Sequence, residues 1–143
     1  MKKGKIILLA LAVLLIAAAL YGWREYHRRH PDTATMEAAY AIPAPALVKA
    51  FQDDENNANK QYNDKVIKVS GTVVKIEHND STQTVQLDGQ SMGGVICQFE
   101  SSHGGELKEL QPGQPVSIKG VCTGMLLDVV LVRCALDKNT ITK

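Results

Sequence analysis

The sequence is poor in aromatic residues, and most of them stand near its start. Among 143 residues there are two Phe, four Tyr and one Trp, and after Tyr62 the only ring is that of Phe99. Proteins that hold single-stranded nucleic acids stack bases on exposed rings in a positively charged groove. Phe99 alternates with Val95 and Cys97, so we expect its ring to point inward. The scarcity of rings therefore disfavours nucleic-acid binding.

Cysteine is also scarce, and its spacing does not match a metal site. Cys97, Cys122 and Cys134 are 25 and 12 residues apart, and they form no C-x-x-C pair. Structural zinc usually needs ligands on short hairpins. A site that combines the three thiols with His103 is therefore disfavoured, and we predict no metal and no cofactor.

Recognisable catalytic patterns are lacking as well. Cys97 or Cys122 with His78 or His103 would give a nucleophile and a base, but no third group to orient the base is evident. Residues 88–94, DGQSMGG, have the glycines of a phosphate-binding loop without the Lys-Ser/Thr ending or a following helix. We interpret the cysteines as small core residues and predict that the protein is not an enzyme.

Net charge is low, and the average hides a division along the chain. Residues 1–30 carry six Lys/Arg and one Glu, whereas residues 31–143 carry ten Lys/Arg and fourteen Asp/Glu, a difference of −4. Phosphate binding needs clustered cations. The acidic balance of the longer part is a second reason to disfavour a nucleic-acid partner.

The longest feature that is present is an apolar run of 18 residues without charge, from Ile6 to Trp23. As a helix it would span about 27 Å, close to the hydrocarbon thickness of a bilayer. Tyr21 and Trp23 at its end suit the membrane interface. We predict a membrane anchor over residues 1–29 with a single span. No cysteine follows this run, which excludes a lipid-modified N-terminus.

Two alternatives to the anchor remain open, namely a cleaved signal peptide and a buried soluble helix. The alanines at positions 17–19 could form a cleavage site. The apolar run continues past them, which favours the uncleaved anchor. Three Lys/Arg flank each side, so the positive-inside rule does not decide the orientation. We favour a domain on the extracytoplasmic (periplasmic) side, because the segment is typical of a bacterial export signal.

Residues 30–44 are predicted to be a linker, since Pro31 and Pro43 stand among small residues without apolar periodicity. A leading helix is predicted over residues 45–62 of a domain that covers 45–143. Pro45 suits its first turn. Four apolar residues recur at offsets of 4, 7 and 4 and share one face: Leu47, Phe51, Ala58 and Tyr62. The acidic run 53–55 is interpreted as part of the solvated face.

After Lys65 the apolar pattern has a period of two, which indicates strands. The first predicted strand, Val66 to Glu77, changes apolar parity before Ile76, so we expect a bulge near Val74 and Lys75. Four more strands are predicted: Thr82–Leu87, a strand that contains Val95, Cys97 and Phe99, Pro115–Val121 and Asp128–Leu136. A helical turn at 106–110 separates the third strand from the fourth. This order describes a mainly β protein, a five-stranded OB-fold barrel.

The chain resembles the tRNA_anti-like OB-fold family, which includes many small exported or lipid-anchored bacterial proteins. The resemblance lies in the following residues: Tyr62, Val69-Ser70-Gly71, Val95-x-Cys97-x-Phe99, Leu110-x-x-Gly113-Gln114-x-Val116-x-x-x-Gly120, Cys122-x-Gly124 and Asp128-Val129-x-Leu131-x-x-Cys134. It implies a fold and a compartment for about residues 45–137, and it implies no catalytic site. The chain departs from the lipoprotein members because it lacks a lipid-acceptor cysteine.

The polar parity of the strands predicts one exposed face of the barrel. It comprises Lys68, Ser70, Thr72, Lys75, Thr84, Gln86, Ser117 and Lys119. This face has three lysines and no ring.

An exported domain permits one disulfide among three cysteines. If Cys122 lies opposite Val129 in a hairpin, Cys134 is too far along the strand to reach it, at about 3.3 Å per residue. In an OB barrel the third and fifth strands run side by side, and a bulge at Arg133 would bring Cys97 next to Cys134. We predict Cys97–Cys134, with Cys122–Cys134 and three reduced thiols as alternatives.

Together these features predict a membrane-tethered binding or interaction module. Its expected partner is a protein or, as a second choice, a saccharide, bound at the open barrel face or the loops. The alternatives are a nucleic-acid-binding OB-fold protein that faces the cytoplasm and a structural component of an envelope assembly.

Overall fold

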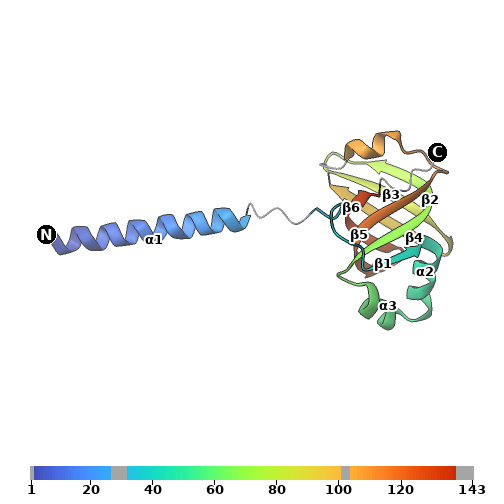
Figure 1. The fold of residues 1–143 in the computed structure, drawn as a ribbon, viewed down its shortest axis with the longest axis horizontal. Coiled ribbons are helices and arrows are strands. Elements are labelled where there is room, and N and C mark those ends of the chain that lie inside the picture. Colours follow the sequence, from blue (N-terminus) through green and yellow to red (C-terminus); the bar gives the residue numbers. More distant parts are fainter. Residues whose placement is uncertain (1, 27–31, 101–103, 138–143) are drawn as a thin grey trace. The chain divides into compact units, whose positions relative to one another are not determined.

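A computed structural model describes residues 2–26, 32–100 and 104–137, and its contacts divide the chain into two units, 1–31 and 32–143. The first unit contains α1 (Lys2–Tyr26), a single straight helix in Figure 1. Its segment Lys3–Tyr26, 24 residues, is long and apolar enough to cross a membrane, and its side chains are exposed. The predicted N-terminal helix is confirmed, and its composition suggests membrane anchoring.

The second unit is a closed five-stranded barrel with one additional strand (Figure 1). The barrel strands are β2 (Val66–His78), β3 (Thr82–Ser91), β4 (Gly93–Glu100), β5 (Pro115–Met125) and β6 (Val129–Leu136). They pair in the order β2-β3-β4-β6-β5, and β5 pairs again with β2 to close the barrel. The β4–β6 pair is parallel and the other barrel pairs are antiparallel. The predicted OB-fold barrel is thus confirmed.

The barrel closes because β2 bends and pairs with two different strands. The first half of β2 pairs with β5, and its second half pairs with β3. The register with β3 shifts between Val73 and Lys75, as the parity change predicts. The extra residue, Val74, is 53% exposed, whereas Val73 is buried. A bulge at this point lets one strand continue around a small barrel.

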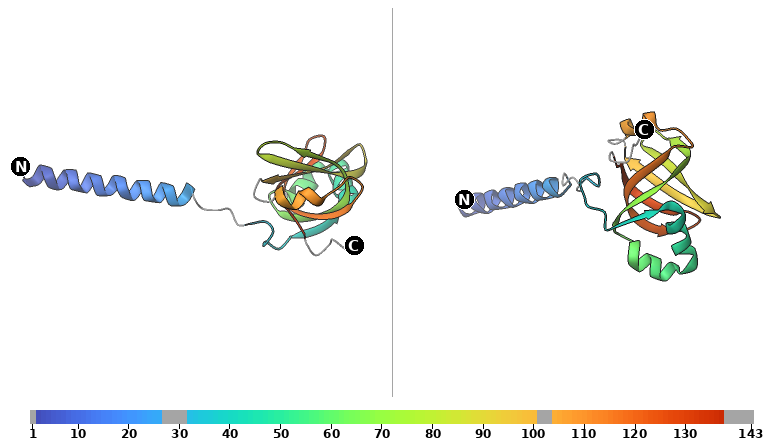
Figure 2. Two further views of the ribbon diagram at one scale, coloured as in Figure 1. Left: turned by 90° about the horizontal axis from the view of Figure 1, so that it is seen from above. Right: turned by 45° about the vertical axis from the view of Figure 1, so that its right-hand side comes forward.

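The barrel interior is filled by the alternating apolar residues of the strands. Val95, Cys97 and Phe99 of β4 are fully buried, which confirms their inward parity. The 3-10 helix η1 (Gly104–Glu109), which corresponds to the predicted helical turn, adds the buried Leu107. In Figures 1 and 2, η1 lies at one end of the barrel, and the two helices within residues 44–62 lie at the other.

Those helices are α2 (Ala44–Asp53) and α3 (Glu55–Tyr62), where the sequence predicts one continuous helix. The break is at Asp54, which has extended backbone angles (φ −154°, ψ 90°) and accepts a hydrogen bond from the Asn57 N–H at 3.0 Å. An aspartate side chain stabilises a helix start in this way, so it ends α2 and begins α3. The predicted apolar face is nevertheless buried: Leu47, Phe51, Ala58 and Tyr62.

Among the predicted segments, the linker over residues 30–44 differs most from the structure. Its described part contains β1 (Tyr40–Pro43), which pairs in parallel with β2 from Ile67 to Ser70. The preceding residues also contact the barrel, because Lys119 Nζ donates hydrogen bonds to the carbonyls of Ala34 (2.9 Å) and Met36 (3.3 Å). Strand pairing of this kind depends on a distant partner, which local sequence patterns do not reveal. Residues 30 and 31 lie outside the described residues.

The glycine-rich connection at 88–94 is also more regular than expected. β3 continues to Ser91 and β4 begins at Gly93, so the connection is a tight hairpin. Gln90 and Gly93 adopt positive φ values of 55° and 114°, which the turn requires. This hairpin places Met92 at its tip, where the side chain is exposed.

Candidate functional site

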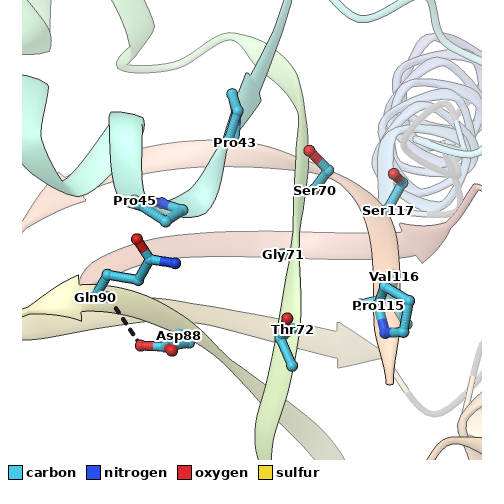
Figure 3. Close-up of a pocket in the computed structure, with 10 residues that line it drawn as sticks. All are labelled: Pro43, Pro45, Ser70, Gly71, Thr72, Asp88, Gln90, Pro115, Val116 and Ser117. Atoms are coloured by element: carbon cyan, nitrogen blue, oxygen red, sulfur yellow. Dashed lines mark hydrogen bonds between the residues drawn. The ribbon is translucent and has the colours of Figure 1, made fainter. Parts of the chain in front are cut away.

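A groove on the barrel surface has a volume of about 310 Å³. It lies beside the middle of β2, where the edge of that strand is partly free. β1 pairs with β2 as far as Ser70, and β3 pairs with β2 from Val73. Gly71 and Thr72 between them pair only with β5. The groove occupies the gap between the end of β1 and the end of β3 (Figure 3).

The lining of this groove combines five polar residues with three prolines, a glycine and a valine, and most of its surface is apolar. It consists of Pro43, Pro45, Ser70, Gly71, Thr72, Asp88, Gln90, Pro115, Val116 and Ser117. Asp88 is the one charged residue of these ten, and its carboxylate accepts a hydrogen bond from the Gln90 N–H at 2.8 Å (Figure 3). Hydroxyl and amide groups suit a peptide or a hydroxyl-rich ligand. The single negative charge is unfavourable for a phosphate group.

The predicted exposed face contributes to the groove only in part. Ser70 and Thr72 are exposed and line it, while Lys75 is exposed elsewhere on β2. Thr84 and Gln86 are half-buried on β3. Ser117, expected to be exposed, is buried, and its carbonyl accepts a hydrogen bond from the Asp137 N–H.

All three lysines of that face are engaged: Lys75 pairs with Glu77 of the same strand at 2.5 Å, and the other two are held by neighbouring segments. Lys68 Nζ lies 3.3 Å from the Asp137 carboxylate, and Lys119 bonds to the two carbonyls described above. The face therefore has fewer free cations than its sequence indicates.

The aromatic rings of the domain are not available for stacking bases. Phe51, Tyr62 and Phe99 are buried. Tyr40 is 36% exposed, but its ring meets the Tyr62 ring in a T-shaped contact with centroids 5.3 Å apart. Lys65 Nζ also lies 5.4 Å from the Tyr40 centroid. The domain thus packs its rings internally, unlike the stacking surfaces of proteins that bind single strands.

The three cysteines are buried, and all three are free thiols in the structure. Cys97 and Cys134 lie next to each other. Burial, reinforced by this neighbour, raises the pKa of Cys134 well above its usual range. Arg133, at a positive φ of 52°, forms the expected bulge beside them. The structure thus places the predicted disulfide partners side by side, and the disulfide itself stays a prediction.

Cys122 is separate from that pair. It lies opposite Leu131, not opposite Val129 as expected, because the strands continue to the Met125–Val129 pair with an irregularity in between. Burial raises the pKa of Cys122 as well, and Asp64 adds to this effect. A thiol with a raised pKa is protonated at neutral pH, which is the opposite of an activated nucleophile.

His78, one of the two histidines considered for a nucleophile site, is not brought next to these thiols. Exposed His78 ends β2, whereas Cys122 lies next to the start of that strand. His103 lies outside the described residues. Within the described ranges, no group of three His, Cys, Asp or Glu side chains could hold a metal ion.

One surface feature was missed by the sequence reasoning, and we call it the apolar tip. It consists of Met92 on the β3–β4 hairpin and Leu126 and Leu127 on the β5–β6 hairpin, which are 90%, 92% and 85% exposed. Turn positions favour Gly, Asn, Asp and Ser. The Leu-Leu pair inside a turn is therefore the sequence signal that could have indicated this surface feature.

These structural features agree with a known family. A family model described as tRNA_anti-like matches residues 1–136. The chain belongs to the tRNA_anti-like family. The match includes the apolar N-terminal helix as well as the barrel. Among curated proteins, this tRNA_anti-like chain has no significant match.

Solved structures resemble this chain at low sequence identity. A Klebsiella pneumoniae lipoprotein, provisionally described as nucleic acid-binding, is 20% identical with a TM-score of 0.58, and the match covers 78% of this chain and 100% of that one. The yeast Stn1 and Ten1 structure gives 15% identity and a TM-score of 0.45 over 73% and 65% of the two chains. An OBody bound to hen egg-white lysozyme gives 16% and 0.42 over 52% and 82%. At these identities the likeness concerns the fold alone.

Proposed function

We propose that this tRNA_anti-like chain is a membrane-tethered, extracytoplasmic binding module that holds a partner protein and catalyses no reaction. The helix α1 is the tether, and the OB-fold barrel is the binding domain. Burial raises the pKa of Cys122, the cysteine outside the predicted disulfide, and so favours a protonated, unreactive thiol there, which supports a non-enzymatic role.

The observation that carries the choice of a protein partner is the packing of the aromatic rings. Three of the four rings in the domain are buried, and the ring of Tyr40 is occupied by Tyr62 and Lys65. Single-strand binding by OB folds depends on free rings and a positive groove. Residues 31–143 instead carry ten Lys/Arg against fourteen Asp/Glu, a difference of −4.

Nucleic-acid binding is the competing function, because the Klebsiella pneumoniae lipoprotein of the same fold is provisionally described in that way. An electrophoretic shift experiment with single-stranded oligonucleotides and the detergent-solubilised full chain separates the two functions. We expect no salt-sensitive shift at low ionic strength. A shift that disappears as salt is added would overturn the choice of a protein partner, since counterion release is typical of phosphate contacts.

The side of the membrane is tested by fusing alkaline phosphatase after Lys143, because that enzyme is active only outside the cytoplasm. We expect an active fusion in a bacterial host. An inactive fusion made at the same level would place the domain in the cytoplasm and overturn this part of the proposal. The mass of the chain recovered from membranes distinguishes an intact anchor from a cleaved signal peptide.

A further inference from the structure

The apolar tip is a rigid feature, because two hairpins are joined at one end of the barrel. Gly93 lies so close to the β5–β6 hairpin that a Cβ on it would be 2.7 Å from the Leu127 carbonyl oxygen. On the same side, the Gly94 N–H donates a 2.6 Å hydrogen bond to the Asp128 carboxylate. The turns that carry Met92 and the two leucines are therefore fixed relative to each other.

The helix α2 holds the β3–β4 hairpin of the tip through hydrogen bonds of Gln52. Gln52 Nε2 donates a hydrogen bond to the Met92 carbonyl at 2.7 Å, and Gln52 Oε1 accepts one from Ser91 Oγ at 3.5 Å. Within the second hairpin, the Leu126 N–H bonds to the Asp128 carbonyl at 3.2 Å. A surface that is ordered before binding loses little conformational entropy when a partner covers it.

The side chains of the tip contribute little to the fold, because all three are almost fully exposed. Single exposed apolar residues are common, but neighbouring ones at a rigid site are typical of interaction surfaces. Burying the two leucines and the methionine against another protein would remove their apolar surface from water. The tip therefore has the properties of a docking site.

The charges around the tip indicate which kind of surface would cover it. The two hairpin segments that form it, residues 88–94 and 125–128, carry only the acidic charges of Asp88 and Asp128. The acidic run 53–55 directly follows Gln52, which bonds to Met92. Lys49 pairs with Asp53 at 2.7 Å and offsets one of them. Charge complementarity at an interface favours a partner of opposite sign.

We propose that the apolar tip docks a partner protein through an apolar pocket or face of that protein edged by Lys or Arg. This inference rests on the proposed function, because it assigns the protein partner to one surface. Anionic lipids would be repelled by the acidic rim, and surface-binding membrane segments are typically rich in Lys and Arg. A second copy of the chain would bring the same acids against each other.

The test uses a photo-crosslinking amino acid, p-benzoylphenylalanine, in the full chain within its native membranes. It replaces Leu126 or Leu127 and, as a control, Val74, which is 53% exposed on the bulge of β2. We expect a discrete adduct between the chain and another protein from the two tip positions and none from position 74. Mass spectrometry of the cross-linked peptide should find Lys or Arg beside the attachment point.

Charge reversal then tests the acidic rim. Glu55→Lys in the crosslinking chain should lower the adduct yield at least fivefold. Glu77→Lys, an equal charge change at the far end of β2, should leave it unchanged. Equal effects of the two substitutions would overturn the role of the rim.

The remaining outcomes separate this inference from the proposed function. A tip adduct of twice the chain mass, or with lipid alone, overturns the inference in favour of a second copy or the membrane. The crosslinker is also placed at Thr72 in the groove. Protein adducts from that position but none from the tip overturn the inference and leave the proposed function standing. If no surface position yields a protein adduct, both fail.

Discussion

Gly120 is the position at which the packing of the barrel can be tested most directly. A Cβ built on Gly120 would lie 2.6 Å from Cys134 Sγ and 3.1 Å from Leu131 Cβ. Atoms of this kind normally stay more than about 3.5 Å apart, so Gly120→Ala must move the sulfur by about 1 Å. Overpacking of a filled core typically costs about 1–3 kcal/mol, and we expect about 2 kcal/mol of lost unfolding free energy.

A double-mutant cycle with Cys134→Ala assigns that cost to the sulfur. Removing Sγ gives the new methyl group space, so Gly120→Ala should cost at most about 1 kcal/mol in this background, the rest arising from Leu131. Pulse proteolysis of the full chain over a urea series, with reductant present, measures each unfolding free energy. Gly105→Ala is the matched control, because a Cβ there meets nothing within 4 Å.

An equal cost of Gly120→Ala in both backgrounds, within about 0.5 kcal/mol, would contradict this contact. It would mean that Cys134 does not pack on Gly120. The position of β6 relative to β5 would then differ from that described above.

Three further predictions concern other parts of the domain. Thiol counting in denaturant should find one free thiol without reductant and three with it, since Cys97 and Cys134 form the predicted disulfide in an oxidising compartment; three in both conditions would exclude the bond. Asp54→Ala removes the N-cap of α3 and should cost about 1 kcal/mol in urea unfolding, whereas Asp53→Ala breaks only an exposed ion pair and should cost at most about 0.5 kcal/mol. Lys119→Met should speed proteolytic cleavage near residues 34–36, because it removes both hydrogen bonds to that segment; an unchanged cleavage rate would show that they do not hold it.

The barrel strands could be predicted from the sequence because each strand shows its own alternation of apolar and polar residues. The alternation of Val95, Cys97 and Phe99 gives their inward parity, and the parity change before Ile76 gives the bulge of β2. Each is a consequence of the two-residue period of a strand. The position of Cys134 beside Cys97 also followed, from the order of strands in the fold and a bulge at Arg133.

The groove and the apolar tip could not be predicted because each needs contacts between distant segments. The groove requires β1 beside Ser70, and nothing in the sequence around Tyr40 specifies that partner. The tip requires two hairpins and α2 to meet, which depends on the Gly94–Asp128 and Gln52–Met92 hydrogen bonds.

The pairing of β1 with β2 determines where the domain can be cut for work in solution. A fragment that begins at Pro45, as the proline pattern suggests, would leave the β2 edge from Ile67 to Ser70 without its partner. Bare strand edges promote association between molecules, so such a fragment should be prone to aggregate. A fragment that begins at Asp32 keeps that edge covered and retains the carbonyl groups that Lys119 binds.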